Sequence, residues 1–290
     1  MSYDNKRLGL GAVFRAFGAA LQWRLLLLWI LGLLLPTLIV ALPYSMALGA
    51  QLDLSVHAGE LARTFSADAF NDLADVFNNN VALSGAMAAS ILVTLLLSPL
   101  LTGMTLTAIR SPRTLGLSEL AQGGMAEYGR LFRMMLWSIV PFGIAIALGS
   151  VGFSAVADRT EKAITTDDVA TIGNLAMFAM AVLFVFAHAT VEAGRAQFAA
   201  DANLRSAIRA WWRGFKLVLR RPFATLGFYL VVTAIGLVIA AVLGIWRIKM
   251  PHASGGGFLL AFVVTQLIVS VNAWTRSARL YALTSVVKAS

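Results

Sequence analysis

Charged residues divide the chain into six long apolar windows. Between consecutive Asp, Glu, Lys or Arg residues, the longest uninterrupted stretches run 25–52, 76–109, 134–157, 169–191, 222–246 and 250–275. A helix of about 20 apolar residues crosses the ~30 Å hydrocarbon core of a bilayer and satisfies its own backbone polar groups. Each window is long enough to cross once and too short to cross twice. The pattern therefore predicts an all-α, polytopic membrane protein with transmembrane helices over roughly 25–49, 81–109, 134–157, 169–194, 222–246 and 257–280.

A short amphipathic segment precedes the first, third and fifth spans, which begin on the same side of the membrane as the N-terminus. Each segment begins with four residues at offsets 0, 4, 7 and 11, which share one helical face. They are Leu10, Phe14, Phe17 and Leu21; Leu117, Ala121, Gly124 and Tyr128; and Leu204, Ile208, Trp211 and Phe215. We therefore expect short interfacial helices, the clearest over 203–220, and three two-span hairpins in a pseudo-threefold repeat within a single domain, 1–290. The alternative is that such starts recur by chance in any protein of this topology.

The composition agrees with a membrane protein, and the placement of charge gives an orientation. Hydrophobic residues make up 59% of the chain and charged residues 13%, whereas soluble domains carry about 25% charged residues. With the N-terminus in the cytoplasm, 18 of the 23 Lys and Arg residues lie on the cytoplasmic side and 9 of the 14 acids lie outside, as the positive-inside rule requires. Arg247 and Lys249 are exceptions. We expect a multi-pass protein of the bacterial inner membrane with both termini cytoplasmic and an outer loop over 50–80.

The first apolar segment is expected to stay in the protein as a span, because it is longer than the 7–15 residues of a signal-peptide core. The chain contains no cysteine, which excludes disulfides, thiolate metal sites and a cysteine nucleophile.

Three ionisable residues near the inner end of the fourth span form the sharpest candidate site. His188, Glu192 and Arg195 are spaced by four and three residues, so they share one helix face. Ionisable groups inside a span are costly and often mark a proton or substrate path. The alternative is an interfacial ion pair between Glu192 and Arg195 that simply ends the span, since charges near helix ends reach water at little cost.

The interfacial helix over 203–220 is the second candidate site, for contact with lipid or with a partner. Its cations fall on one face, and two tryptophans typical of the headgroup level accompany them; these residues are Arg205, Arg209, Arg213, Lys216 and Arg220 with Trp211 and Trp212. Such a helix is expected to contact anionic lipid headgroups. The alternative is a docking surface for a cytoplasmic protein partner, and a homo-oligomer is a further alternative. Nucleic acid is not expected as a partner, because the segment is too apolar for a nucleic-acid arm.

No pattern of an enzyme or of a metal site emerges from the remaining residues. Asp68, Asp72 and Asp75 share a face of the outer loop, but a solvated acidic face fits them better than a cation site. Phosphate-binding loops, zinc motifs and paired carboxylates inside the spans are all missing from the sequence. We therefore expect a non-enzymatic protein with no catalytic residue, no metal and no cofactor.

The region after Ala189 carries a resemblance to known families. It reads TVEAGRAQFAADANLRSAIRAWWRGFKLVLRRPFATLGFYL: a returning helix, an Asp-x-x-Leu-x-x-Ala turn, an amphipathic helix, Leu-Arg-Arg-Pro and the next span. Over these 40 or so residues the chain resembles the six-span bacterial inner-membrane families that include YciC-type proteins and the membrane domain of some glycerophosphodiester phosphodiesterases. The resemblance implies a six-span fold and assigns no functional residue, and the hydrolase domain of those phosphodiesterases has no counterpart here.

These observations favour a transport-related or lipid-handling membrane component, acting alone or as a subunit with a cytoplasmic partner. Two alternatives remain open. One is a structural or assembly scaffold of the cell envelope, and the other is a lipid-headgroup enzyme at the cytoplasmic interface, built around His188 and Glu192.

Overall fold

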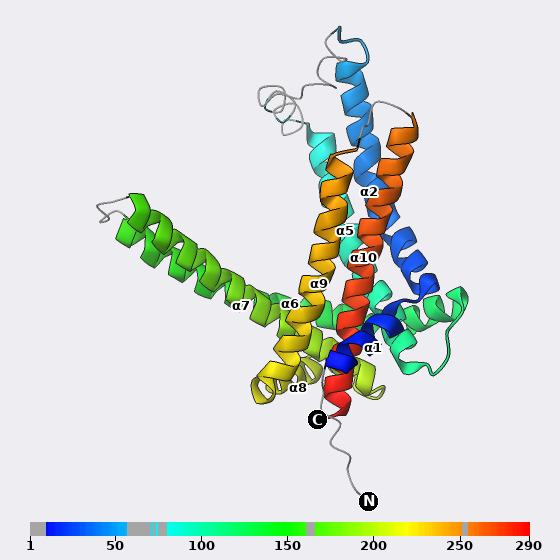
Figure 1. The fold of residues 1–290 in the computed structure, drawn as a ribbon, viewed down its shortest axis with the longest axis vertical. Coiled ribbons are helices and arrows are strands. Elements are labelled where there is room, and N and C mark those ends of the chain that lie inside the picture. Colours follow the sequence, from blue (N-terminus) through cyan, green and yellow to red (C-terminus); the bar gives the residue numbers. More distant parts are fainter. Residues whose placement is uncertain (1–9, 57–70, 72–73, 75–79, 161–165, 251–254) are drawn as a thin grey trace, which may run out of the picture.

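The computed structural model describes residues 10–56, 71, 74, 80–160, 166–250 and 255–290, and every regular element in these ranges is a helix (Figure 1). The helices are α1 (Leu10–Ala20), α2 (Trp23–Leu52), α5 (Val81–Arg110), α6 (Leu117–Thr160), α7 (Thr166–Ala200), α8 (Ala207–Arg220), α9 (Pro222–Ile248) and α10 (Gly255–Lys288). Six of them, α2, α5, α6, α7, α9 and α10, are long and apolar enough to cross a membrane. The prediction of a six-span helical membrane protein is confirmed.

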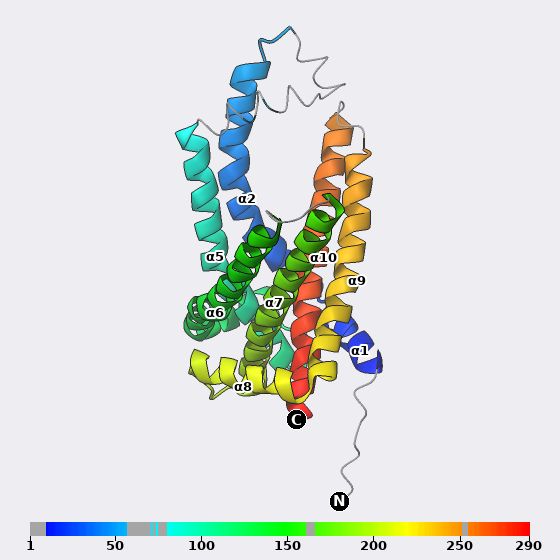
Figure 2. The ribbon, with the colours of Figure 1, turned by 90° about the vertical axis from the view of Figure 1, so that its left-hand side faces the viewer.

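The helices form three hairpins that meet at one end of the molecule. The α2–α5 and α9–α10 hairpins run alongside one another, whereas the α6–α7 hairpin leans away from them toward its own turn (Figures 1 and 2). α8 lies across the common end in contact with α6, α7 and α9. α1 packs there against α10, where Trp274 Nε1 donates to the carbonyl oxygen of Phe17 (3.0 Å). We call this the inner end, and both described ends of the chain lie on it, as an even number of spans requires.

The middle unit differs from the expectation of a separate amphipathic segment followed by a span from 134. Leu117 to Thr160 form one unbroken helix, α6. No proline precedes Pro141 in this stretch, and Arg130 is paired with Glu127 inside the protein, so nothing ends the helix before the apolar region. In the other two units a break is present, because residues 21 and 22 separate α1 from α2, and Pro222 stops α8 and begins α9. The three units therefore have the same order of elements along the chain. They differ in whether the helix is broken before the first span of the unit and in the direction of the hairpin.

Two other predicted boundaries also shift. The interfacial helix begins at Ala207 and not at 203, because Ser206 caps it by accepting from the backbone N–H of Arg209 (3.3 Å). Asp201 accepts from the backbone N–H of Asn203 (3.0 Å), which favours a turn at these residues over a helix. The outer loop begins later than residue 50, because α2 continues to Leu52.

The packed core is concentrated at the inner end. Its largest cluster combines side chains from α5, α6, α7, α8 and α10, among them Leu106, Met134, Phe198, Ala210 and Leu283. Toward the opposite end, apolar side chains on the spans are largely exposed, as expected of surfaces that face lipid. The inner end is therefore the part of the molecule in which side-chain contacts between helices can build a site.

Glycines allow two pairs of helices to approach closely at the inner end. A Cβ atom on Gly103 of α5 would lie 2.8 Å from the carbonyl oxygen of Gly124 in α6. A Cβ atom on Gly214 of α8 would lie 2.4 Å from the backbone nitrogen of Gly194 in α7. Both contacts are with backbone, so neither is relieved by a side-chain rotation. Small residues at such crossings are typical of helices that associate inside a membrane.

Candidate functional site

Glu192 is the centre of a buried ionic cluster at the inner end of α7, and this residue is only 1% exposed. Arg195 Nη1 lies 2.6 Å from Glu192 Oε1, one helical turn away. His188 Nε2 lies 3.9 Å from the same oxygen, and Arg279 of α10 places Nη2 3.8 Å from it. The three residues predicted as a site are thus brought together on one helix face, with Arg279 as a fourth member. We call these four residues the Glu192 cluster.

Further hydrogen bonds hold His188 and Arg279 in place. The hydroxyl of Tyr229 in α9 lies 2.8 Å from His188 Nδ1. Arg279 Nη1 donates to Thr233 Oγ1 (3.2 Å), and its guanidinium lies 5.2 Å from the centre of the Tyr229 ring. The cluster therefore joins α7, α9 and α10 through side chains. Because a charge in a low-dielectric interior requires a close partner, two arginines around one carboxylate compensate the cost of burying Glu192.

The space beside Arg195 in the Glu192 cluster is narrow. Arg195 lines a small cavity together with Ser98, Pro99, Thr102 and Met135, and this cavity has no room for a water molecule. On this side the cluster can fix the relative positions of helices, and passage of a solute beside Arg195 would require the helices to move, whereas the His188 side chain is 28% exposed. The role of His188, Glu192 and Arg195 as a proton or substrate site stays a prediction.

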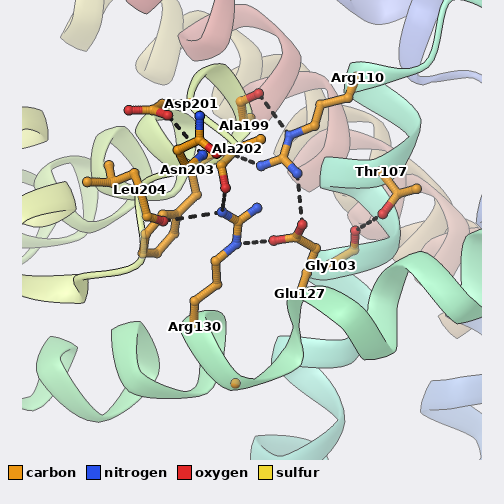
Figure 3. Close-up of polar contacts among 12 residues, drawn as sticks. Gly103, Thr107, Arg110, Glu127, Arg130, Ala199, Asp201, Ala202, Asn203 and Leu204 are labelled. Atoms are coloured by element: carbon orange, nitrogen blue, oxygen red, sulfur yellow. Dashed lines mark hydrogen bonds and ion pairs between the residues drawn. The ribbon is translucent and has the colours of Figure 1, made fainter.

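A second ionic cluster, which the sequence analysis did not identify, lies between α5, α6 and the end of α7 (Figure 3). Glu127 of α6 is its only acid among the described residues. One carboxylate oxygen accepts from Arg110 Nη1 of α5 (2.8 Å), and the other accepts from Arg130 Nε, one turn along α6. We call these three residues the Glu127 cluster.

The two arginines of the Glu127 cluster also bond backbone carbonyls, Arg110 in the last turn of α7 and Arg130 in the α7–α8 turn that follows. The last four carbonyl oxygens of a helix have no partner within it and carry the negative end of the helix dipole. Arg110 donates to the carbonyl oxygens of Phe198 and Ala199, and Arg130 Nη1 donates to those of Ala202 (3.0 Å) and Leu204 (3.2 Å). Each arginine therefore pairs with a carboxylate and holds the α7–α8 turn in place (Figure 3).

α8 presents three different faces. The docked face is buried against the bundle and consists of Ala207, Ala210, Gly214, Leu217 and Val218. A second face is an exposed apolar stripe formed by Ile208, Trp212 and Leu219, which are four and seven residues apart. The third face is exposed and cationic, and it consists of Arg209, Arg213, Lys216 and Arg220. The last two faces adjoin, which is the arrangement of a helix that lies in the plane of a membrane interface.

The structure places the predicted interfacial residues in two different environments. Arg205 is exposed in the turn before α8, and Trp212 is exposed on the apolar stripe with the Lys216 ammonium 5.4 Å from its ring centre. Trp211 is half-buried and points inward, because its Nε1 donates to Thr190 Oγ1 of α7 (3.1 Å). The indole of Trp211 therefore anchors α8 to the bundle, instead of lying free at the headgroup level as its position in the sequence suggested.

Neither a metal-binding group among the described residues nor a comparison with known proteins assigns a function to these clusters. In the described part of the chain, no group of three or more His, Asp or Glu side chains is placed to hold a metal ion. The acidic residues Asp68, Asp72 and Asp75 of the outer loop lie outside the described residues. The chain matches no known family model, no curated protein and no solved structure. The resemblance to six-span bacterial families therefore stays a prediction.

Proposed function

We propose that this membrane protein is a non-enzymatic, lipid-handling component of the bacterial inner membrane, with its inner end at the cytoplasmic headgroup region. The observation that supports this proposal is the exposed half of α8, where an apolar stripe adjoins a row of cations. An in-plane helix of this kind inserts its apolar stripe at the acyl boundary, and each cation near an anionic surface contributes about 1 kcal/mol.

The attachment of α8 to the bundle supports a role beyond simple anchoring. Its docked face meets α7 at the Gly194–Gly214 contact, and Pro222 follows it directly at the start of α9. At the same end, Arg221 Nη1 donates to the carbonyl oxygen of Ala289 (3.0 Å), next to the end of α10. A lipid held by α8 is therefore coupled mechanically to three spans, which is what movement or presentation of a lipid by the protein requires.

Because the chain has no cysteine, single introduced cysteines test where α8 lies. In proteoliposomes, an environment-sensitive dye on Ile208→Cys is expected to be shielded from aqueous iodide, and the same dye on Arg209→Cys is expected to be quenched. In intact cells, an impermeant maleimide is expected to label Lys249→Cys at the opposite end of the protein and to leave Arg209→Cys unlabelled. Equal quenching at positions 208 and 209, or surface labelling of position 209, would contradict the proposed placement.

Lipid handling itself is tested in vesicles that contain fluorescent phosphatidylglycerol. The protein is expected to increase transbilayer movement of this lipid, measured by dithionite quenching, above that of protein-free vesicles. The double variant Arg209→Glu with Arg213→Glu is expected to lose most of the increase, because it reverses the charge at the headgroup contact. Lys249→Glu at the other end is the matched control and is expected to behave as the parent. An unchanged rate in the double variant would contradict the role of α8.

A second candidate function is proton-coupled movement of a solute, which the Glu192 cluster favours. His188 lies within 4 Å of Glu192 and is hydrogen-bonded to Tyr229, so a titratable ring connects two buried groups between spans. If this function holds, Glu192→Gln abolishes the pH dependence of uptake in proteoliposomes. Unchanged pH dependence in that variant would leave Glu192 with a structural role only.

A further inference from the structure

Two clefts open beside the inner end of α6, and they meet at Arg133 and Arg205. The first is an apolar cleft of about 580 Å³, with walls formed by Leu136, Trp137, Val140, Ala207 and Ile208. The second is a polar cleft of about 380 Å³, lined by Ala126, Glu127, Gly129, Arg130 and Ala202. Arg133 and Arg205 line both clefts. Each volume is within the range of 300–1,000 Å³ that is common for small-molecule sites.

The arginines at this junction keep donors available for a ligand. Arg133 and Arg205 are both exposed, and among the described residues Arg133 bonds only through its Nε, which donates to the carbonyl oxygen of Gly129 (3.1 Å). Arg205 makes no hydrogen bond or ion pair with any residue in the described ranges. Guanidinium groups in such a position bind phosphate through paired N–H donors.

The wall of the polar cleft contains a buried donor without a partner. Arg130 is only 8% exposed, and its Nη2 has no hydrogen-bond partner among the described residues, although Nε and Nη1 are both bonded (Figure 3). Glu127, the acid in the lining, is already bonded to Arg110 and to Arg130. The junction therefore has an excess of positive charge, and an unsatisfied buried donor of this kind calls for a ligand or water.

From these observations we propose that the junction of the two clefts is a binding site for one anionic glycerophospholipid. The phosphate lies between Arg133 and Arg205. The rest of the headgroup enters the polar cleft near Arg130, and an acyl chain follows the apolar cleft along Trp137 and Val140. A lipid is the occupant because the apolar cleft begins where the polar one ends, and because Arg133 stands at the predicted start of the span. This site gives a specific ligand class to the lipid handling proposed above and rests on that proposal.

The test is binding of defined lipids to the purified, detergent-solubilised full chain, measured by native mass spectrometry. The probes are dioleoyl phosphatidylglycerol, dioleoyl phosphatidylcholine, and two chain-free compounds, glycerophosphoglycerol and inorganic phosphate. We expect one phosphatidylglycerol per chain, bound at least tenfold more tightly than phosphatidylcholine and than either chain-free compound. The double variant Arg133→Gln with Arg205→Gln is expected to weaken phosphatidylglycerol binding at least tenfold. Both residues are exposed, so the change leaves the fold intact, whereas Arg130 is avoided because it holds the Glu127 cluster.

The matched control is Arg15→Gln with Lys288→Gln, which removes the same charge from exposed positions at the inner end that lie outside α8 and line neither cleft. It is expected to bind lipid as the parent does. The proposal is overturned if the Arg133/Arg205 variant keeps the affinity of the parent, if phosphatidylcholine binds equally well, or if inorganic phosphate binds as tightly as the lipid. If the site binds as expected while lipid movement in vesicles matches protein-free vesicles, the site stands and the proposed function alone fails.

Discussion

Neutralising Glu192 is expected to destabilise the protein by about 3 kcal/mol. The side chains of Arg195 and Arg279 are 12% and 11% exposed, so both depend on this carboxylate for compensation. Removal of one partner from a buried ion pair costs about 3–5 kcal/mol, because it leaves an uncompensated charge. Glu192→Gln belongs at the lower end of this range, since the amide oxygen still accepts a hydrogen bond from Arg195. Glu192→Ala removes that acceptor as well and belongs nearer the upper end.

The matched control for this prediction is Glu119→Gln. Glu119 pairs with Arg113 at 2.5 Å, but the two side chains are 43% and 67% exposed. An exposed pair of this kind contributes at most about 1 kcal/mol. The free energy of unfolding would be measured by titration with sodium dodecyl sulfate in mixed micelles, at low salt and at high salt. We expect a large, salt-independent loss at Glu192 and a small loss at Glu119 that fades with salt. If the two variants lost unfolding free energies that agree within about 0.5 kcal/mol, the idea that Glu192 compensates buried charge would be refuted.

Three further predictions concern the attachment of α8 and the Glu127 cluster. Gly214→Ala places a Cβ atom 2.4 Å from the backbone of α7 and is expected to cost about 1–3 kcal/mol in unfolding titrations. Its control is Gly129→Ala, whose Cβ atom meets nothing within 4 Å and which is expected to be neutral or stabilising. Equal effects of the two substitutions would refute the close contact between α8 and α7. Trp211→Phe removes the bond to Thr190, and a double-mutant cycle with Thr190→Val is expected to give a coupling energy of about 0.6 kcal/mol for this bond; a coupling energy of zero would refute its role. Glu127→Gln is expected to increase hydrogen exchange of the α7–α8 turn, measured by mass spectrometry, because its arginines lose their counter-charge; unchanged exchange would show that the backbone contacts suffice.

The number of spans and the grouping of one candidate site could be predicted from local sequence information. A charge-free window of more than 20 residues leaves the chain no alternative to a spanning helix. The spacing of His188, Glu192 and Arg195 likewise fixes a common helix face without any knowledge of the neighbouring helices. Both features depend on residues within a single helix, through the length of an apolar stretch in one case and the spacing of side chains in the other, and the structure bears them out.

Features that depend on other helices could not be predicted. Arg110 and Glu127 are 17 residues apart, and their pairing requires the close α5–α6 crossing at Gly103 and Gly124. The inward direction of Trp211 likewise depends on the position of Thr190 in α7. The Glu127–Arg130 spacing of three was a signal available in the sequence, but an ion pair at this spacing is common on solvated helices and does not identify a buried site.

The continuity of α6 explains why the lipid site proposed above needs the whole inner end. An amphipathic segment separated from its span, as in the other two units, would be free to tilt in the interface. In α6 the same rigid helix carries Glu127, which is bonded to α5, and Arg133 and Val140, which line the cleft against α8. α8 is docked on α7, and the turn before α8 is held to α6 through Arg130, so both walls of the cleft belong to the same packed unit as the α6–α7 hairpin. A lipid whose phosphate bridges Arg133 of α6 and Arg205 of the turn before α8 would therefore stabilise the contact between these two elements, and its site depends on the α6, α7 and α8 contacts of the inner end.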